Sequence, residues 1–441
     1  MSADQDLTLK KIFLTWWPLA VSWFLMALEL PALSAVIARL PDPKINLAAY
    51  GGIVFPLALI IEAPIIMLLA ASTALSKDWK SYKKIRRFMH TTSAVLTMFH
   101  ILIVSTPLYY FVVEFLIGSP QEIIAPARIG LAIMLPWTWS IAYRRFNQGV
   151  LIRLGHTVAV GKGTFVRLST NIIVLIAGYL ISTIPGIVVA TTAVAVGVIS
   201  EAIFIGIIVK PVIKEQLIPL SEIKPELSQK SFLQYYIPLA LTSLITLLSQ
   251  PLISSALSRM PRALDSLAVW PVLSGLLFIF RSSGIAYNEV VVTLINKPNS
   301  YANLKKYALI LVSSTTGLLL LITITPLSTI WFKYISALPA SLISLANTAL
   351  WLSLLIPGAN AFQSWYQGLI LNSGKTRGIP EAVAIFLAVT IAIYTIGIYW
   401  VDLPGIYIGT LGFSLGMICQ TIWLKIRSQK AIEFINSADV S

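Results

Sequence analysis

One apolar stretch occurs twice in this chain, at positions that differ by 220 residues. The first copy, residues 18–41, reads PLAVSWFLMALELPALSAVIARLP, and the second, residues 238–261, reads PLALTSLITLLSQPLISSALSRMP. Each copy is long enough to cross a bilayer and carries a proline near its middle, Pro31 or Pro251. Because a proline inside a helix removes a backbone hydrogen bond, we expect a bent or broken helix in each copy. The repeat predicts that the two halves of the chain share one architecture.

The duplication continues to the end of both halves, where the separation becomes 219 residues. The pair Gln148-Gly149 recurs as Gln367-Gly368, and PGI at 185–187 recurs at 404–406. Each half contains six apolar stretches. We expect membrane spans at about 12–40, 47–76, 90–117, 126–152, 164–184 and 186–210, and again at about 231–259, 266–296, 306–328, 340–372, 379–401 and 404–426.

The composition is that of a membrane protein. Of the 441 residues, 57% are hydrophobic and 11% are charged, whereas a soluble domain carries about 25% charged residues. We therefore predict an all-α membrane protein with twelve transmembrane helices in two six-helix lobes, related by a pseudo-two-fold axis along the membrane normal. The expected domains are an N-lobe, residues 1–210, a cytoplasmic linker, residues 211–230, and a C-lobe, residues 231–441.

The basic residues indicate the orientation. The net charge is +14, and the segment KDWKSYKKIRR at 77–87 holds six Lys or Arg residues, whereas GSPQEIIAPA at 118–127 holds none. Because basic residues collect in cytoplasmic loops, we interpret the charge as a topology signal and not as a nucleic-acid surface. We expect an integral protein of the plasma (inner) membrane with both termini in the cytoplasm.

The constellations that enzymes use are absent from the sequence. The histidines, His90, His100 and His156, lack metal-ligand spacing, and no Gly-rich phosphate loop or nucleophile elbow occurs. The single cysteine, Cys419, excludes an intramolecular disulfide. We expect no enzymatic activity, no cofactor and no metal. The expected partners are the lipid bilayer, a small-molecule substrate, and a proton or sodium ion as coupling ion.

Polar side chains inside the apolar spans are the candidates for function, because a charge at the bilayer centre costs roughly 2.5–3.5 kcal/mol. For each of them, a functional role and a purely structural role both stay open. Glu29 lies two residues before Pro31 and either titrates or bridges backbone groups freed by the proline. For Glu201, we favour a structural role in which it pairs with a residue of another helix. The candidates for contact with substrate or coupling ion are Glu29, Glu62, Arg281, Glu289, Arg144, Arg145, Gln250 and Asn360.

The repeat also relates two of these candidates. Adding 220 to Glu62 gives Ser282, one position from Arg281. Equivalent helices around a two-fold axis can face each other, so the sequence predicts that this acid and this base lie close across a central cavity. The pair would act either as a gate or substrate site, or as a structural tie between helices.

Two six-span halves, proline-bent first and seventh spans, and the R-x-x-x-Q-G pattern of Arg144, Gln148 and Gly149 resemble the MATE branch of the multidrug/oligosaccharidyl-lipid/polysaccharide flippase superfamily. The stretches PGIVVATTAVAVGVIS and PGIYIGTLGFSLGMIC resemble that group's sixth and twelfth spans. The resemblance covers nearly the whole chain and implies two lobes around a V-shaped cavity. It also implies that Glu29 corresponds to the coupling carboxylate of the first span.

A closer resemblance is to the progressive ankylosis protein family. The matching stretches are WWPLA at 16–20, the Glu29 region of the first span, SKDWKSYKK at 76–84, SQPLISSALSR at 249–259 and residues 284–289. It implies export of polyvalent anions such as citrate, nucleotide or pyrophosphate. The chain departs from that pattern at Gln250, where an arginine is expected before the proline.

We therefore predict secondary active export by alternating access. Glu29 is expected to titrate, and Arg281 with Arg144 or Arg145 is expected to contact an anionic group of the substrate. The alternative is a flippase for a lipid-linked oligosaccharide or lipid precursor, which would require a basic cavity.

Overall fold

The computed structural model describes residues 7–220, 226–297, 300–373 and 376–438, and every regular element within them is a helix. The predicted all-α class is confirmed. By their internal contacts these residues form two compact units, each described here by itself. Unit 1 contains the residues up to Ala35 and those from Arg259 onward, and unit 2 contains Val36–Ser258. The chain ends and the linker residues 221–225, which we expect in the cytoplasm, lie outside the described residues.

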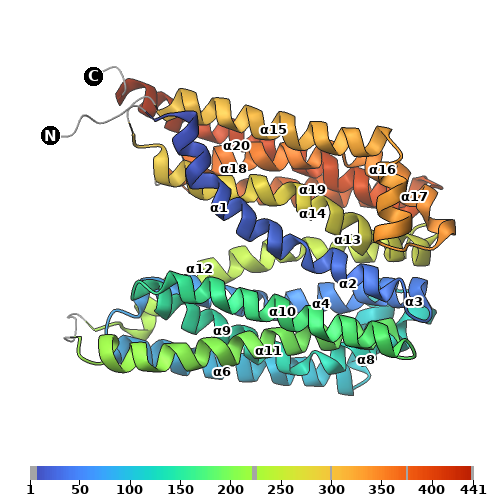
Figure 1. Cartoon of the computed structure of the whole chain (residues 1–441), viewed down its shortest axis with the longest axis horizontal. Helices are drawn as coiled ribbons and strands as arrows, with labels where there is room; N and C mark the ends of the chain where they lie inside the picture. The colour runs from blue at the N-terminus through green and yellow to red at the C-terminus, as the bar shows by residue number, and fades with distance from the viewer. Residues whose placement is uncertain (1–6, 221–225, 298–299, 374–375, 439–441) are drawn as a thin grey trace. The chain divides into compact units, whose positions relative to one another are not determined.

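Unit 1 contains the first helix and most of the second half of the chain (Figure 1). Its helices are α1 (Leu9–Ala27), most of α2 (Glu29–Ile37), α14 (Ala263–Leu294), α15 (Ser300–Ile324), α16 (Leu327–Ile330), the π-helix η4 (Trp331–Ile335), α17 (Ala340–Leu352), α18 (Ile356–Asn372), α19 (Gly378–Trp400) and α20 (Gly405–Ala438).

Unit 2 contains the remainder of the first half and the first span of the second (Figure 1). Its helices are α3 (Pro43–Ala49), η1 (Tyr50–Val54), α4 (Phe55–Ile66), α5 (Leu68–Leu75), α6 (Trp79–Ser105), α7 (Leu108–Tyr110), η2 (Phe111–Ile117), α8 (Gln121–Ile133), α9 (Leu135–Arg153), α10 (Thr157–Ile181), α11 (Gly186–Val212), η3 (Ile213–Leu217), α12 (Gln229–Leu247) and α13 (Ser249–Ser258).

The two units differ from the lobes expected from the order of the sequence, because each half's first span packs in the other unit. In unit 1, α1 lies on α14 and α15, and Trp16 Nε1 donates a hydrogen bond to the Ser283 carbonyl at 2.9 Å. In unit 2, α12 lies on α4, and the Tyr236 hydroxyl donates to the Pro64 carbonyl at 2.5 Å. Trp16 and Tyr236 are equivalent positions, 220 residues apart. In each exchanged span, the polar tip of an aromatic side chain thus donates a partly buried hydrogen bond to a backbone carbonyl.

The predicted helix breaks are confirmed in both copies of the repeat. Helix α1 ends at Ala27 and α12 ends at Leu247, and each end lies four residues before the proline, Pro31 or Pro251. A proline ring clashes with the carbonyl of the residue four positions earlier. The same steric cause therefore breaks both spans at the same place.

Equivalent hydrogen bonds show that the sequence repeat is also a structural repeat. In unit 2, Asn46 Oδ1 accepts from the Ile187 N–H at 3.2 Å, and in unit 1, Ser266 Oγ accepts from the Ile406 N–H at 3.0 Å. Adding 220 to 46 gives 266, and adding 219 to 187 gives 406. These N–H groups lie in the first turns of α11 and α20, where helices leave donors unsatisfied.

In the described part of the chain, eleven helical segments are long and apolar enough to cross a membrane. The expected fourth span, 126–152, is not among them. It consists of α8 and α9, which meet at Met134, and α9 carries Arg144, Arg145 and Arg153. Most of the side chains of α9 are buried, and the helix packs on α5, α6 and α11. A helix enclosed by other helices has less lipid-facing surface to keep apolar.

Two segments that we expect to be irregular contain helical residues. The basic segment 77–87 is expected as a loop, but α6 begins at Trp79. Asp78 is the cause, because its Oδ1 accepts from the Ser81 N–H at 2.7 Å and caps the first turn. The expected linker, 211–230, contains the end of α11, the π-helix η3 and the start of α12.

Gly149 is the point at which α9 approaches α5. A Cβ atom there would lie 1.8 Å from Ser72 Oγ and 2.4 Å from the Leu69 carbonyl oxygen. We expect Gly149→Ala to destabilise the purified protein by about 1–3 kcal/mol, seen as a lower melting temperature in fluorescence-detected size-exclusion chromatography. Gly161 is the control, because a Cβ there meets nothing within 4 Å. Equal melting temperatures for Gly149→Ala and Gly161→Ala would contradict this packing of α5 on α9.

Candidate functional site

A cluster of charged side chains is buried in unit 2 among α4, α9, α10 and α11. Glu201 of α11 is 0% exposed and accepts from Arg144 Nη1 at 2.5 Å and from Gln148 Nε2 at 2.9 Å. Arg167 of α10 places its Nε 3.5 Å from the same carboxylate. The pairing between helices expected of Glu201 is therefore present, and it joins α9 and α10 to α11.

Glu62 of α4 is the second carboxyl group of this cluster. It is 4% exposed, and it interacts electrostatically with Arg145, Arg144 and Arg167. Neither Glu62 nor Arg145 makes a side-chain hydrogen bond or ion pair with the described residues, and Glu62 Oε2 is fully buried. Three guanidinium groups thus surround two carboxyl groups, and the pairing is complete at Glu201 but not at Glu62.

The equivalent positions of unit 1 hold uncharged side chains. Adding 219 to Arg144 and to Glu201 gives Gln363 on α18 and Gln420 on α20. Gln363 Nε2 donates to Gln420 Oε1 at 3.3 Å, so the contact between the fourth and sixth spans is kept. The positions that form an ion pair in unit 2 therefore form an amide pair in unit 1.

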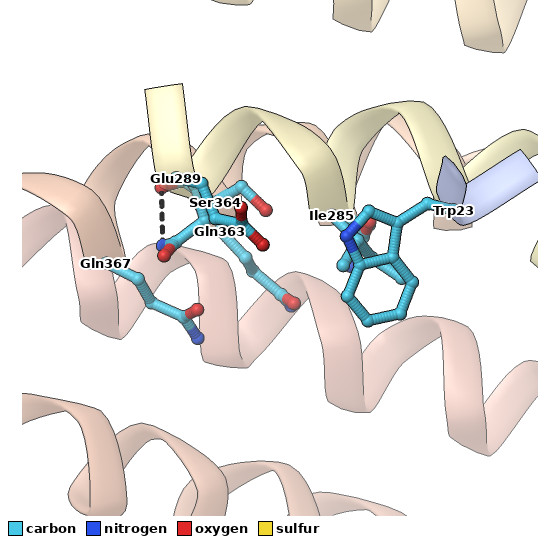
Figure 2. Close-up of a pocket in the computed structure, with 8 residues that line it drawn as sticks. Trp23, Ile285, Glu289, Gln363, Ser364 and Gln367 are labelled. Carbon is cyan, nitrogen blue, oxygen red and sulfur yellow. Dashed lines mark hydrogen bonds between the residues drawn. The ribbon is translucent and has the colours of Figure 1, made fainter. Parts of the chain in front are cut away.

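Unit 1 also contains a cavity of about 300 Å³ between α1, α14 and α18, shown in Figure 2. Residues at i, i+3 and i+4 on a helix share a face, and this spacing places two groups of side chains on the cavity. The lining residues are Trp23 of α1, Ile285, Asn288 and Glu289 of α14, and Asn360, Gln363, Ser364 and Gln367 of α18.

The polar groups of this cavity are only partly paired. Asn288 Nδ2 donates to the Ser364 carbonyl at 3.1 Å, the hydrogen bond drawn in Figure 2. The side chains of Glu289, Asn360 and Gln367 make no hydrogen bond or ion pair with the rest of the described chain. Asn360 is 7% exposed, so a buried amide is left unsatisfied beside an open space. Such an amide is costly in a dry interior.

Five of the eight predicted residues belong to one of these two groups. Glu62, Arg144 and Arg145 belong to the charged cluster, and Glu289 and Asn360 line the cavity. The other three residues are members of neither group: Glu29 begins α2, Gln250 is the second residue of α13, and Arg281 on α14 lies over the Phe413 ring at 5.7 Å. Glu29 and Gln250 are partly buried.

Four residues of these two groups are not among those predicted from the sequence: Arg167, Trp23, Asn288 and Gln367. Arg167 lies near the start of the fifth expected span and has the pattern of a cytoplasmic anchor. Trp23 has the pattern of a lipid-facing aromatic residue. The repeat contained a signal for Gln367, because its equivalent is Gln148 of the charged cluster.

No protein-family model matches the chain, and no curated protein matches its sequence. Solved structures do match. An inward-facing multidrug resistance MATE family transporter of the MOP superfamily is 16% identical with a TM-score of 0.72, covering 94% of this chain and 99% of its own. An outward-facing structure of such a transporter is 15% identical with a TM-score of 0.63, covering 98% of both chains.

A MOP superfamily transporter from Pyrococcus furiosus, for which a reverse polarity of the binding pocket suggests a different function, is 15% identical with a TM-score of 0.64 and covers 97% of both chains. At these identities the likeness establishes the fold alone. The chain has the fold of MATE transporters, as the resemblance in the sequence implies, and it is an integral membrane protein whose described residues include eleven helical segments long and apolar enough to cross a membrane.

The repeat suggests a test of the charged cluster. Glu201→Gln leaves the buried Arg144 without its carboxylate, and removing one partner of a buried pair costs about 3–5 kcal/mol. We expect a large fall in melting temperature for this variant. The double variant Arg144→Gln/Glu201→Gln recreates the amide pair that unit 1 carries, so it should recover at least half of the loss. A double variant no more stable than Glu201→Gln would contradict the interaction between the two side chains.

Proposed function

We propose that the chain is a secondary active exporter that moves a small organic substrate by alternating access, with twelve membrane-crossing helices in two lobes. The fold carries this proposal, because transporters with the same fold adopt inward-facing and outward-facing conformations. Buried charges within spans support it, since ionisable residues inside a membrane commonly mark ion or substrate pathways.

The proposed orientation has both termini in the cytoplasm of a plasma (inner) membrane. Several segments converge at one end of unit 2. Lys80 Nζ lies 2.9 Å from Glu226 Oε1, Lys84 donates to the Leu227 carbonyl, and Arg153 donates to the Thr73 carbonyl at 2.9 Å. The hydrogen bond from Lys80 lowers the pKa of Glu226 below its ordinary value, which keeps the acid charged beside these basic residues. A basic end of this kind is typical of the cytoplasmic face.

Labelling with a membrane-impermeant maleimide tests this orientation. In a Cys419→Ser background, we expect Lys83→Cys to remain unlabelled in intact cells and to be labelled after permeabilisation, because the Lys83 side chain is exposed. Glu122→Cys is the control for the other end of α6. Glu122 and Arg128 both belong to α8, and Arg128 donates to the Val104 carbonyl near the C-terminal end of α6, so α8 lies at that end. Labelling of position 83 from outside would reverse the topology.

We propose that Glu62 carries the coupling proton. Burial favours the neutral form of a carboxyl group, whereas nearby guanidinium groups favour the charged form. These opposite influences meet at Glu62, which has no hydrogen-bond partner in the described residues to fix one form. Glu29 is the second candidate, from its place on the first span. The pairing of Glu62 with Arg281 stays a prediction.

The proposed substrate class includes anions, as the sequence suggests. Arg145 and Arg281 carry positive charge inside the spans, and neither has a carboxylate within ion-pair distance among the described residues. Arg144 is engaged by Glu201, so Arg145 is the better candidate of that pair for an anionic group. Sodium is the alternative coupling ion.

Flux into proteoliposomes tests the function. We expect a pH gradient, or a sodium gradient, to drive uptake of at least one compound from a panel of citrate, nucleotides, pyrophosphate, organic cations and sugars. Glu62→Gln and Glu29→Gln should insert normally and lose pH-driven flux by tenfold or more, because an amide cannot carry a proton. Glu122→Gln, an exposed acid of unit 2, is the control and should transport as wild type. Wild-type flux and pH dependence in either variant would remove that residue from the mechanism, and an absence of gradient-driven flux of any compound would contradict the exporter.

A further inference from the structure

We infer that the cavity between α1, α14 and α18 binds a small uncharged molecule with several hydroxyl groups, such as a sugar. The inference rests on the proposed function only in calling this molecule a substrate. Binding itself depends on the lining of the cavity. Its volume of about 300 Å³ lies at the lower end of the range for ligand sites, which suits a compact ligand.

The deep wall of the cavity is made of neutral groups that both donate and accept hydrogen bonds. Asn360 and Gln363 are 7% and 5% exposed, and Ser364 is 4% exposed. A primary amide offers two N–H donors and a carbonyl acceptor, which matches a hydroxyl group that also does both. A fully ionised anion offers only acceptors, and an ammonium group offers only donors, so each would leave half of this wall unpaired.

The hydrogen bonds that these amides make within the protein leave some of their polar atoms available to a ligand. Gln363 uses its Nε2 on the Met417 carbonyl at 3.0 Å and on Gln420 Oε1 at 3.3 Å, so it has its Oε1 left to accept from a ligand, while the Asn360 and Gln367 side chains have no partner in the described residues. A site built from unpaired buried amides discriminates strongly in favour of ligands that supply the missing hydrogen bonds. Gly284 makes room for this arrangement, because a Cβ there would lie 2.9 Å from Asn360 Oδ1.

The remaining walls fit the same ligand. Trp23 of α1 presents a half-buried indole at one end of the cavity (Figure 2). An aromatic ring packs well against the C–H face of a sugar ring, and its N–H can donate to a hydroxyl. Glu289 is the one carboxylate of the lining and is exposed, so it can accept from a hydroxyl at the mouth. Its charge also repels anions from this cavity.

The repeat indicates why this cavity is neutral. The positions of Arg144, Arg145 and Gln148 in unit 2 correspond to Gln363, Ser364 and Gln367 in unit 1. Two guanidinium groups are thus replaced by an amide and a hydroxyl, and the third position remains an amide. The face of the fourth span that is ionic in unit 2 is a neutral hydrogen-bonding surface in unit 1.

Calorimetry on the purified full-length protein tests the inference, in a detergent without a sugar headgroup. The probes are methyl glucoside, methyl galactoside and N-acetylglucosamine, with tetraethylammonium and citrate as charged comparisons. We expect at least one sugar to bind, and neither charged compound to bind at this cavity. Asn360→Leu removes one amide at nearly constant volume and should weaken sugar binding about tenfold, the effect of losing a buried hydrogen bond.

Two further variants keep the result interpretable. Asn347→Leu removes another amide of unit 1 that is also partly buried but does not line the cavity, so it should bind sugar as wild type does. Glu289→Gln removes the charge and keeps a weaker hydrogen-bond acceptor, so sugar binding should weaken less than it does in Asn360→Leu and should not be abolished. If tetraethylammonium binds instead and Glu289→Gln abolishes that binding, the cavity is a cation site and the inference is wrong.

The outcomes for binding and transport are separable. Gradient-driven flux of other compounds, with no sugar binding to the wild-type protein, would overturn the inference and leave the proposed exporter standing. Sugar binding that Asn360→Leu weakens and Asn347→Leu does not would support the inference, even if no gradient drives flux.

Discussion

The contact between the fourth and sixth spans of each half supports both sites. In unit 2 this contact is the ion pair of Arg144 with Glu201, and in unit 1 it is the amide pair of Gln363 with Gln420. A lone buried charge costs several kcal/mol, so Glu201 holds α9 in one rotational setting. Successive residues of a helix point about 100° apart. Fixing Arg144 on α11 therefore turns Arg145 away from Glu201, and Arg145 acts electrostatically on Glu62 of α4.

The same geometry positions the cavity of unit 1. Gln363 is held to α20 by the Met417 carbonyl and by Gln420. Asn360 and Gln367 lie one turn before and one turn after it, on the face that lines the cavity with α1 and α14. A duplicated scaffold thus carries two different chemistries at equivalent positions. Charged groups respond to pH and to membrane potential, whereas amides respond to neither. Because of this difference between charged groups and amides, we propose ion coupling for unit 2 and recognition of a neutral ligand for unit 1.

The sequence was sufficient to predict the helical class, the repeat and the broken spans, because each depends on local covalent or hydropathic properties. Pro31 and Pro251 break their helices for a steric reason that needs no tertiary information. The exchange of α1 and α12 between units was not predictable, since a broken helix does not indicate which neighbours its two parts choose. The start of α6 was predictable from the sequence, because Asp is a preferred N-cap residue. Asp78 precedes the helix, and its Oδ1 accepts from the Ser81 N–H.

The candidate site was predicted only in part, for a related reason. Residues deep in a span, such as Glu62 and Arg144, stand out against apolar neighbours and were found. Arg167 and Trp23 lie where basic and aromatic residues are ordinary, so only their partners reveal them. Five of the predicted residues divide between the charged cluster of unit 2 and the cavity of unit 1, because equivalent helices keep their packing and differ in charge.

The incomplete pairing of Glu62 is what makes the charged cluster sensitive to conformation. Arg144 and Arg167 are engaged by Glu201, which leaves Arg145 as the group whose position can change the charge balance at Glu62. At an effective dielectric constant of about 20, two unit charges attract by about 4 kcal/mol at 4 Å and by about 2 kcal/mol at 8 Å. A shift of a few ångströms between α4 and α9 therefore changes the attraction by about 2 kcal/mol, or roughly 30-fold in a protonation equilibrium. This equals a typical coupling energy between sites, so a modest rearrangement of two packed helices is enough to link proton uptake at Glu62 to the state of the transporter.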